Sequence, residues 1–232
     1  MKLAALYSGG KDSTFAIYKA KSEGYDVKCL VTIFPHSDES KFLHYPNINM
    51  TSLQAESMKL PQLSSYAVSN DTKIELSELE FLLGQAKQVF GIEGIVHGGI
   101  LSEFQKNHFE DICKKLSLKI ISPLWGIDQK QYMKKLIESD FKFIITSVSS
   151  EGLDDSLLGR EITKNDIDDL EKLSITHGFN LSFEGGEAES LVLDCPLFSK
   201  PLKIIKSNKT WDGYRGRFEI TEEMLQYQCL TI

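Results

Sequence analysis

Two stretches of the chain carry residue types that could do chemistry. The first is Ser8-Gly9-Gly10-Lys11-Asp12-Ser13, which directly follows an apolar run. Its glycines let the backbone approach an anion closely, because no Cβ stands in the way. A turn of this kind between a strand and a helix directs backbone N–H groups at phosphate. Lys11 adds a positive charge, Asp12 a carboxylate and the serines hydroxyl donors, so the stretch predicts a nucleotide site.

The second stretch, Glu184-Gly185-Gly186-Glu187-Ala188-Glu189-Ser190, places three glutamates within six residues around a Gly-Gly turn. Like charges this close repel one another unless a cation, a metal or hydrogen-bond donors lie among them. Asp194 ends the apolar strand that follows, so we expect it to face the same cavity. The pattern leaves open both a substrate site and a solvated acidic turn.

Strands and helices alternate through the first half of the chain. The apolar runs and turn residues predict strands at 2–7, 26–34, 65–68, 92–98 and 118–121, and helices at 13–23, 51–60, 75–90 and 102–116. Thr51 and Ser102 are the expected caps of two of these helices. The alternation is typical of a parallel sheet, in which ligands bind at the carboxyl ends of the strands. We therefore assign Ile33, Phe34 and Gly98 to the nucleotide site.

The second half of the chain has a different pattern, and Pro123 to Gly126 marks the boundary. We predict a Rossmann-like α/β domain over residues 1–124 and a smaller C-terminal α+β domain over residues 125–232. The second domain is expected to contain helices at 128–138 and 164–177, a strand at 141–148, a loop at 151–160 and a strand-rich remainder. The polar segment 35–49 is expected to close over the nucleotide or to link two elements.

Composition narrows the function classes. The net charge of −7 over 232 residues argues against stable nucleic-acid binding, which calls for a basic face. No apolar run approaches the length of a membrane span. Cys29, Cys113, Cys195 and Cys229 lie far apart, which excludes a four-cysteine zinc ribbon and a vicinal dithiol. We expect thiols in a reducing cytosol and no protein-held metal site.

The first stretch resembles the PP-loop of the ATP pyrophosphatases, which have an adenine nucleotide α-hydrolase type of fold. It is not a Walker A loop, because Ala5 stands at the first glycine position and Asp12 follows the lysine. The resemblance implies cleavage of ATP between the α- and β-phosphates, with Mg²⁺ on the triphosphate. The AMP would activate a carbonyl or carboxylate.

The stretch EGGEAESLVLDCPLF, residues 184–198, resembles the signature of the diphthine–ammonia ligase family. Ala188 departs from that signature, because an aromatic residue is usual there, and His97-Gly98-Gly99 is a variant of the usual strand end. Supporting stretches occur in the family's order at 33–35, 44–48, 98–105, 123–126, 152–160 and 211–213. The resemblance therefore covers nearly the whole chain.

The resemblance implies a specific reaction. ATP would adenylate the carboxylate of diphthine on translation elongation factor 2, and ammonium would displace AMP to give diphthamide, with pyrophosphate as the other product. Lys11, Asp12 and Glu187 are the implied catalytic residues. The implied substrate-binding residues are Gln105, Arg160, Glu184, Gly185, Gly186, Glu187, Glu189, Ser190 and Asp194. Without the resemblance, Arg160 would be expected to form an ordinary ion pair on the surface. The division of roles among the glutamates stays open.

The nitrogen source can be argued from the cysteines. A glutaminase needs a nucleophilic cysteine, and removal of Met1 would expose Lys2; no other cysteine lies in a glycine-flanked turn. Free ammonium is therefore the expected amine.

Two other functions remain open at this point. They are a thiolase-like, tRNA-modifying PP-loop enzyme and a non-catalytic ATP-binding sensor. A homo-oligomer is compatible with the sequence.

Overall fold

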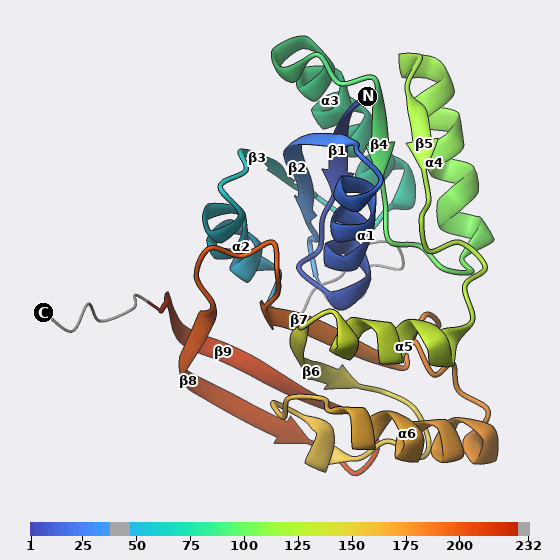
Figure 1. Ribbon diagram of the computed structural model, residues 1–232, viewed down its shortest axis with the longest axis vertical. Helices are drawn as coiled ribbons and strands as arrows, with labels where there is room; N and C mark the ends of the chain where they lie inside the picture. Colours follow the sequence, from blue (N-terminus) through green and yellow to red (C-terminus); the bar gives the residue numbers. More distant parts are fainter. Residues whose placement is uncertain (38–46, 227–232) are drawn as a thin grey trace, which may run out of the picture.

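The structure is a computed structural model that describes residues 1–37 and 47–226. Much of the polar segment 35–49, part of the supporting stretch 44–48, and Cys229 lie outside the described residues. The chain forms an α/β layer above a second, smaller sheet (Figure 1). Among the described residues, no helix has both the length and the apolar character needed to cross a membrane.

The first sheet has five strands in the order β3-β2-β1-β4-β5. All of its neighbouring strands pair in parallel. The strands are β1 (Lys2–Leu6), β2 (Asp26–Phe34), β3 (Gln62–Tyr66), β4 (Gly94–Val96) and β5 (Lys119–Ile121). From β1 the chain continues to β2 and β3 on one side of the sheet, and it then crosses to β4 and β5 on the other side of β1. The strand order therefore reverses between β1 and β4. The crevice for a ligand therefore lies at the carboxyl ends of β1 and β4.

Helices cover both faces of this sheet (Figure 1). They are α1 (Lys11–Ser22), α2 (Thr51–Met58) after a short 3₁₀ turn η1 (Ile48–Met50), α3 (Thr72–Phe90) and α4 (Glu103–Leu116). Alternate residues of β1 explain the two layers. Leu3 and Ala5 pack with the apolar face of α1, whereas Ala4 packs with α3 and α4. The predicted Rossmann-like α/β fold is confirmed.

The second sheet has four strands in the order β7-β6-β9-β8, and its neighbouring strands are antiparallel. They are β6 (Lys142–Val148), β7 (Ala188–Asp194), β8 (Leu202–Trp211) and β9 (Gly216–Leu225). With it belong α5 (Gln129–Glu138), α6 (Lys164–His177) and the 3₁₀ turn η2 (Asp155–Leu157). The predicted smaller C-terminal α+β part is confirmed, with β8 and β9 as a long hairpin (Figure 1).

One apolar core runs from the first layer into the second. Phe15 of α1 packs against Tyr132 of α5 and Phe141, with ring centroids 5.6 and 5.2 Å apart. The same buried cluster continues through Phe143 to Val192 of β7. The two halves are therefore packed together at α1 and α5, and the division at residue 124 stays a prediction.

Several element boundaries differ from the expectation. The strand predicted at 65–68 is β3 at Gln62–Tyr66, and the strand predicted at 92–98 is the shorter β4 at Gly94–Val96. Thr51 does not cap α2 but is its first residue, because residues 48–50 already form a 3₁₀ turn and the Thr51 hydroxyl donates to the Ile48 carbonyl. Helix α3 begins at Thr72 because the Asp71 carboxylate accepts the Lys73 N–H as a cap. The Ser102 cap is confirmed, since its hydroxyl accepts the Gln105 N–H.

Gly98 provides a test of how closely β4 approaches α1. A Cβ at this position would lie 2.5 Å from the Asp12 carbonyl carbon and 2.6 Å from the Ser13 nitrogen, both of which are backbone atoms. We expect Gly98→Ala to lower the free energy of unfolding by about 2 kcal/mol or more, because the phosphate loop must shift. Gly84→Ala is the matched control, since a Cβ there meets nothing within 4 Å and favours the helix. Urea unfolding measures both, and equal stabilities of the two variants would contradict the tight approach.

Candidate active site

A cavity of about 390 Å³ lies at the carboxyl ends of β1 and β4, between the glycine loop and the turn at 184–190. Thirteen of the residues predicted for the site line it: Ser8, Gly10, Lys11, Asp12, Ser13, Ile33, Gly98, Gln105, Glu184, Gly185, Gly186, Glu189 and Ser190. The two stretches that the sequence singled out therefore meet in one cavity. The contact between Lys11 and Ser190 joins residues 179 positions apart in the sequence.

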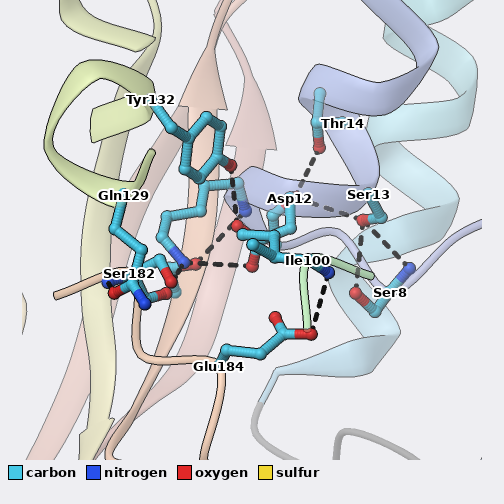
Figure 2. Close-up of polar contacts among 12 residues, drawn as sticks. Ser8, Asp12, Ser13, Thr14, Ile100, Gln129, Tyr132, Ser182 and Glu184 are labelled. Atoms are coloured by element: carbon cyan, nitrogen blue, oxygen red, sulfur yellow. Dashed lines mark hydrogen bonds and ion pairs between the residues drawn. The ribbon is translucent and has the colours of Figure 1, made fainter. Parts of the chain in front are cut away.

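The glycine loop has the geometry expected of a phosphate site. Gly9 has a positive φ of 80°, and Gly10 occupies the cap position of α1 without a side-chain cap. The first-turn N–H groups of a helix have no partner within the helix and carry its positive dipole end. Ser8 and Ser13 lie side by side, with their hydroxyl oxygens 3.2 Å apart (Figure 2). The loop can therefore bind an anion.

Strand β7 holds this loop in place. The Val192 N–H donates to the Gly9 carbonyl at 3.1 Å, and the Lys11 N–H donates to the Ser190 hydroxyl at 3.2 Å. The buried amide of Gln54 donates to both Gly9 and Val192 carbonyls, at 3.0 and 2.8 Å. The strand after the acidic turn is thus bonded directly to the phosphate loop.

The Lys11 ammonium group faces the C-terminal half. Its side chain is 2% exposed, and Nζ donates to the Ser182 carbonyl at 2.6 Å and to Asp12 Oδ2 at 3.0 Å. It also lies 5.5 Å from the centre of the Phe183 ring. The predicted phosphate-binding lysine therefore joins the loop to the segment that leads into the acidic turn.

Tyr132 is a site residue that the sequence analysis missed. Its hydroxyl donates to Asp12 Oδ1 at 2.6 Å, from the buried face of α5 (Figure 2). Burial and the neighbouring carboxylate raise the pKa of Tyr132 well above its ordinary value, so the phenol stays protonated. No motif marked this tyrosine, because it sits in an amphipathic helix like any core aromatic residue.

The three glutamates of the acidic turn have different surroundings. Glu184 Oε1 accepts the Ile100 N–H at 2.9 Å (Figure 2). It also accepts the Leu101 N–H at 3.2 Å. Burial raises the pKa of Glu184, and these backbone donors oppose that rise. Its carboxylate thereby fixes the loop between β4 and α4, which forms the opposite wall of the cavity.

Glu187 stabilises the turn itself. Its Oε1 accepts the backbone and side-chain N–H groups of Asn180, both at 2.8 Å, and its Oε2 accepts the Gly185 N–H at 2.7 Å. Of the described residues that line the cavity, Glu184 and Glu189 are two, and Glu187 is not one of them. The solvated acidic turn that the sequence left open does not fit this arrangement, because hydrogen-bond donors hold the Glu184 and Glu187 carboxylates.

Five predicted site residues do not line the cavity: Gly9, Phe34, Arg160, Glu187 and Asp194. Arg160 forms an exposed ion pair with Asp166 at the start of α6. Asp194 pairs with Lys142 at 3.3 Å. It lies at the far end of β7, roughly 20 Å along the strand from Ala188 at a rise of about 3.3 Å per residue. Substrate binding by Arg160 or Asp194 stays a prediction that these positions do not support.

Phe34 and His97 lie at the strand ends, but in different settings. The Phe34 ring stacks on the Tyr66 ring with centroids 4.7 Å apart, and Phe34 is not among the residues that line the cavity. His97 lines the cavity and is fixed by two hydrogen bonds. Its Nδ1 accepts the Gly99 N–H at 3.1 Å, so Nε2 carries the proton and donates to Ser122 Oγ at 2.7 Å. Burial lowers the pKa of His97 from 6.5 to about 4.

A glycine-rich turn at the N-terminus of α1, placed at the switch point of a parallel β3-β2-β1-β4-β5 sheet, is the geometry of a nucleotide-binding α/β protein, and the sequence of this turn, residues 8–13, is that of the PP-loop class. The chain belongs to the diphthamide synthase family. The model of the diphthamide synthase N-terminal domain matches residues 1–120, and that of the diphthamide synthase C-terminal domain matches residues 128–225.

Relatives with the name diphthine–ammonia ligase are similar over most of the chain. The protein from Mus musculus is 34% identical over 225 residues, which cover 89% of this chain and 84% of the relative. The protein from Homo sapiens is 33% identical over the same length, with 89% and 84% covered. A solved structure from Methanocaldococcus jannaschii, described as a predicted subunit of tRNA methyltransferase, is 13% identical with a TM-score of 0.41. It covers 84% of this chain and 98% of its own.

The buried His97 predicts a pH dependence of stability. The unfolded chain takes up a proton on this residue below about pH 6.5, whereas the folded protein does so only near pH 4. Stability is therefore lost as the pH falls from 6.5 towards 4, by about 2 kcal/mol at pH 5 from this group. Urea unfolding at pH 7 and pH 5 measures this loss. The variant His97→Asn keeps an acceptor for the Gly99 N–H but has no imidazole to protonate, so its stability should fall by about 2 kcal/mol less between pH 7 and pH 5. Equal losses of stability in both proteins would contradict the assignment of this pH dependence to His97.

Proposed function

We propose that this protein is an ATP-dependent ligase that amidates diphthine on translation elongation factor 2 with ammonium. The products are diphthamide, AMP and pyrophosphate. Family membership supports the reaction, and the observation that carries it is the Lys11–Ser190 contact, which puts the phosphate loop and the acidic turn in one cavity. The reaction serves translation, so we place the protein in the cytoplasm.

The N-terminal half binds and activates ATP. The loop from Ser8 to Ser13 and the N-terminus of α1 surround the β- and γ-phosphates with N–H and hydroxyl donors. These donors stabilise the negative charge that develops on the leaving pyrophosphate. Ile33 and Gly98 lie at the strand ends beside the loop and line the remaining nucleotide pocket.

The donor set also fits Mg²⁺ as a companion of the triphosphate. Mg²⁺ is usually held by one or two carboxylates together with substrate phosphates, not by a protein cage. Within residues 1–37 and 47–226 no cluster of three or more histidine, cysteine or acidic residues could hold a metal. Asp12, whose carboxylate lines the cavity next to the loop, is the residue that would hold it. The ion would neutralise and orient the triphosphate.

The acidic turn and its surroundings receive the acceptor. Glu184 and Glu189 line the cavity and are suited to a cation, either ammonium or the trimethylammonium group of diphthine. Ala188, at the position where the family usually has an aromatic residue, also lines the cavity and leaves room beside them. Gln105 lies on the opposite wall, where its amide can contact the acceptor.

The reaction then takes two steps. An oxygen of the diphthine carboxylate attacks the α-phosphorus, the bond to the β-phosphate oxygen breaks, and pyrophosphate leaves. Ammonia then attacks the acyl carbon, the attacking nitrogen gives up a proton to solvent, and AMP leaves with the carboxylate oxygen. Ammonium must lose a proton before this attack. Glu184 lines the cavity and is placed to accept it, and burial, which raises its pKa, favours a proton acceptor there.

Two alternatives receive less support. A thiolase-like, tRNA-modifying enzyme would call for a basic face, whereas the chain has a net charge of −7. A sensor that binds ATP without turnover would have no need of an acidic turn bonded to the phosphate loop.

Acceptor-dependent product formation tests the proposal. The protein is mixed with Mg-ATP, ammonium and elongation factor 2 that carries diphthine, and AMP and the mass of the modified peptide are measured. We expect one AMP per amide, and a fall of at least 100-fold in Asp12→Asn, because the carboxylate at the loop is lost.

Asp169→Ala is the matched control for this experiment, because it removes an exposed carboxylate of α6 that pairs with Lys172 on the surface. It should retain full activity. ATP binding by the unsubstituted protein with neither AMP nor amide would overturn the proposed function and leave the sensor.

A further inference from the structure

We propose that Tyr132 is a positioning residue for the amidation, and that its hydroxyl fixes the Asp12 carboxylate at the phosphate loop. The tyrosine comes from α5 in the C-terminal half, whereas Asp12 belongs to the N-terminal half (Figure 2). This inference rests on the proposed function, because its effect is measured on that reaction.

Each oxygen of the Asp12 carboxylate accepts a hydrogen bond from a different partner. Oδ1 accepts the Tyr132 hydroxyl at 2.6 Å, and Oδ2 accepts the Lys11 ammonium at 3.0 Å. A carboxylate held at both oxygens has one orientation, so the side chain at the loop is set before ATP arrives. Without the phenol, Asp12 would keep, of these two bonds, the one from Lys11, and its Oδ1 would lose the donor that comes from α5.

The same turn of α5 also fixes the segment before the acidic turn. Gln129, one helical turn before Tyr132, accepts the Ser182 N–H with its Oε1 at 3.0 Å. The Ser182 carbonyl in turn accepts the Lys11 ammonium at 2.6 Å. The contacts form a closed circuit of Asp12, Tyr132, Gln129, Ser182 and Lys11. One helical turn thereby sets the phosphate loop relative to the acceptor segment.

Packing alone does not account for the hydroxyl of Tyr132. The side chain is 0% exposed, and its ring packs against Phe15 in an aromatic cluster that a phenylalanine would fill equally well. A buried hydroxyl is costly unless it is hydrogen-bonded, and here it is bonded to a loop carboxylate. The phenol touches Asp12 and lies outside the cavity wall, so its action on the reaction passes through that carboxylate.

Removal of the hydroxyl should therefore slow the reaction more than it weakens binding. A displacement of about 1 Å in a group that orients the reactants can cost about 100-fold in rate. In Tyr132→Phe we expect kcat for amide formation to fall at least 10-fold. The KM for Mg-ATP should change less than threefold, because the glycine loop and its serines are unaltered.

Tyr18→Phe is the matched control. Tyr18 belongs to the same aromatic cluster, with its ring 5.6 Å from Phe15 and 5.6 Å from Phe141, but it stands six residues further along α1 than Asp12. It should keep kcat within twofold. Thermal unfolding of both variants and of the unsubstituted protein shows whether the fold is intact.

The experiment measures AMP, amide and unfolding temperature for the three proteins with elongation factor 2 that carries diphthine. A fall in kcat confined to Tyr132→Phe, with KM and unfolding temperature preserved, supports the positioning role. A kcat within threefold of the unsubstituted protein, or a loss matched by Tyr18→Phe or by unfolding, overturns it while the proposed function stands. Absence of amide with the unsubstituted protein overturns both.

Discussion

The hydrogen bonds between the glycine loop and β7 are the interaction on which the rest of the structure depends. The Gly9 carbonyl accepts from Val192, the Lys11 N–H donates to Ser190, and the Gln54 amide joins Gly9 to Val192. Buried backbone groups must find partners, and here the loop of one half finds them in a strand of the other. The two halves therefore cannot separate without exposing or orphaning these groups, and the cavity between them has a fixed shape.

Buried charge adds a second constraint of the same kind. A lysine that is almost fully buried would be costly unless it is paired and hydrogen-bonded. The Lys11 ammonium meets this requirement with Asp12 from its own loop and the Ser182 carbonyl from the other half. Gly98 then allows β4 to approach the same loop closely, since any Cβ would collide with the Asp12 backbone. Charge pairing and close packing therefore both constrain the position of the loop.

The sequence predicted the parts of the molecule that depend on local patterns. Glycines, apolar runs and capping residues such as Ser102 were enough to place the phosphate loop, the parallel sheet and most helices. The meeting of the loop with the acidic turn could be expected only from the resemblance to a family. Sequence patterns could not give Tyr132 a role, because its hydroxyl bond to Asp12 joins residues 120 positions apart.

The acidic turn shows the same limit within a few residues. Spacing alone made Glu184, Glu187 and Glu189 equivalent, whereas the fold gives Glu187 to the Asn180 and Gly185 N–H groups and leaves Glu189 on the cavity wall. Asp194 was expected at the cavity because it follows the motif. The extended strand β7 instead places it at the end of the strand that is distant from the cavity, where it pairs with Lys142. Distance along a strand separated residues that the motif had grouped together.

The central claim is that the acceptor carboxylate and the α-phosphate react within one cavity. It is tested most directly with a diphthine carboxylate labelled with ¹⁸O and mass spectrometry of the products. The account predicts one ¹⁸O atom in AMP for each amide formed, because the carboxylate oxygen leaves with the nucleotide. Label found in inorganic phosphate or pyrophosphate, or AMP free of label, would contradict it.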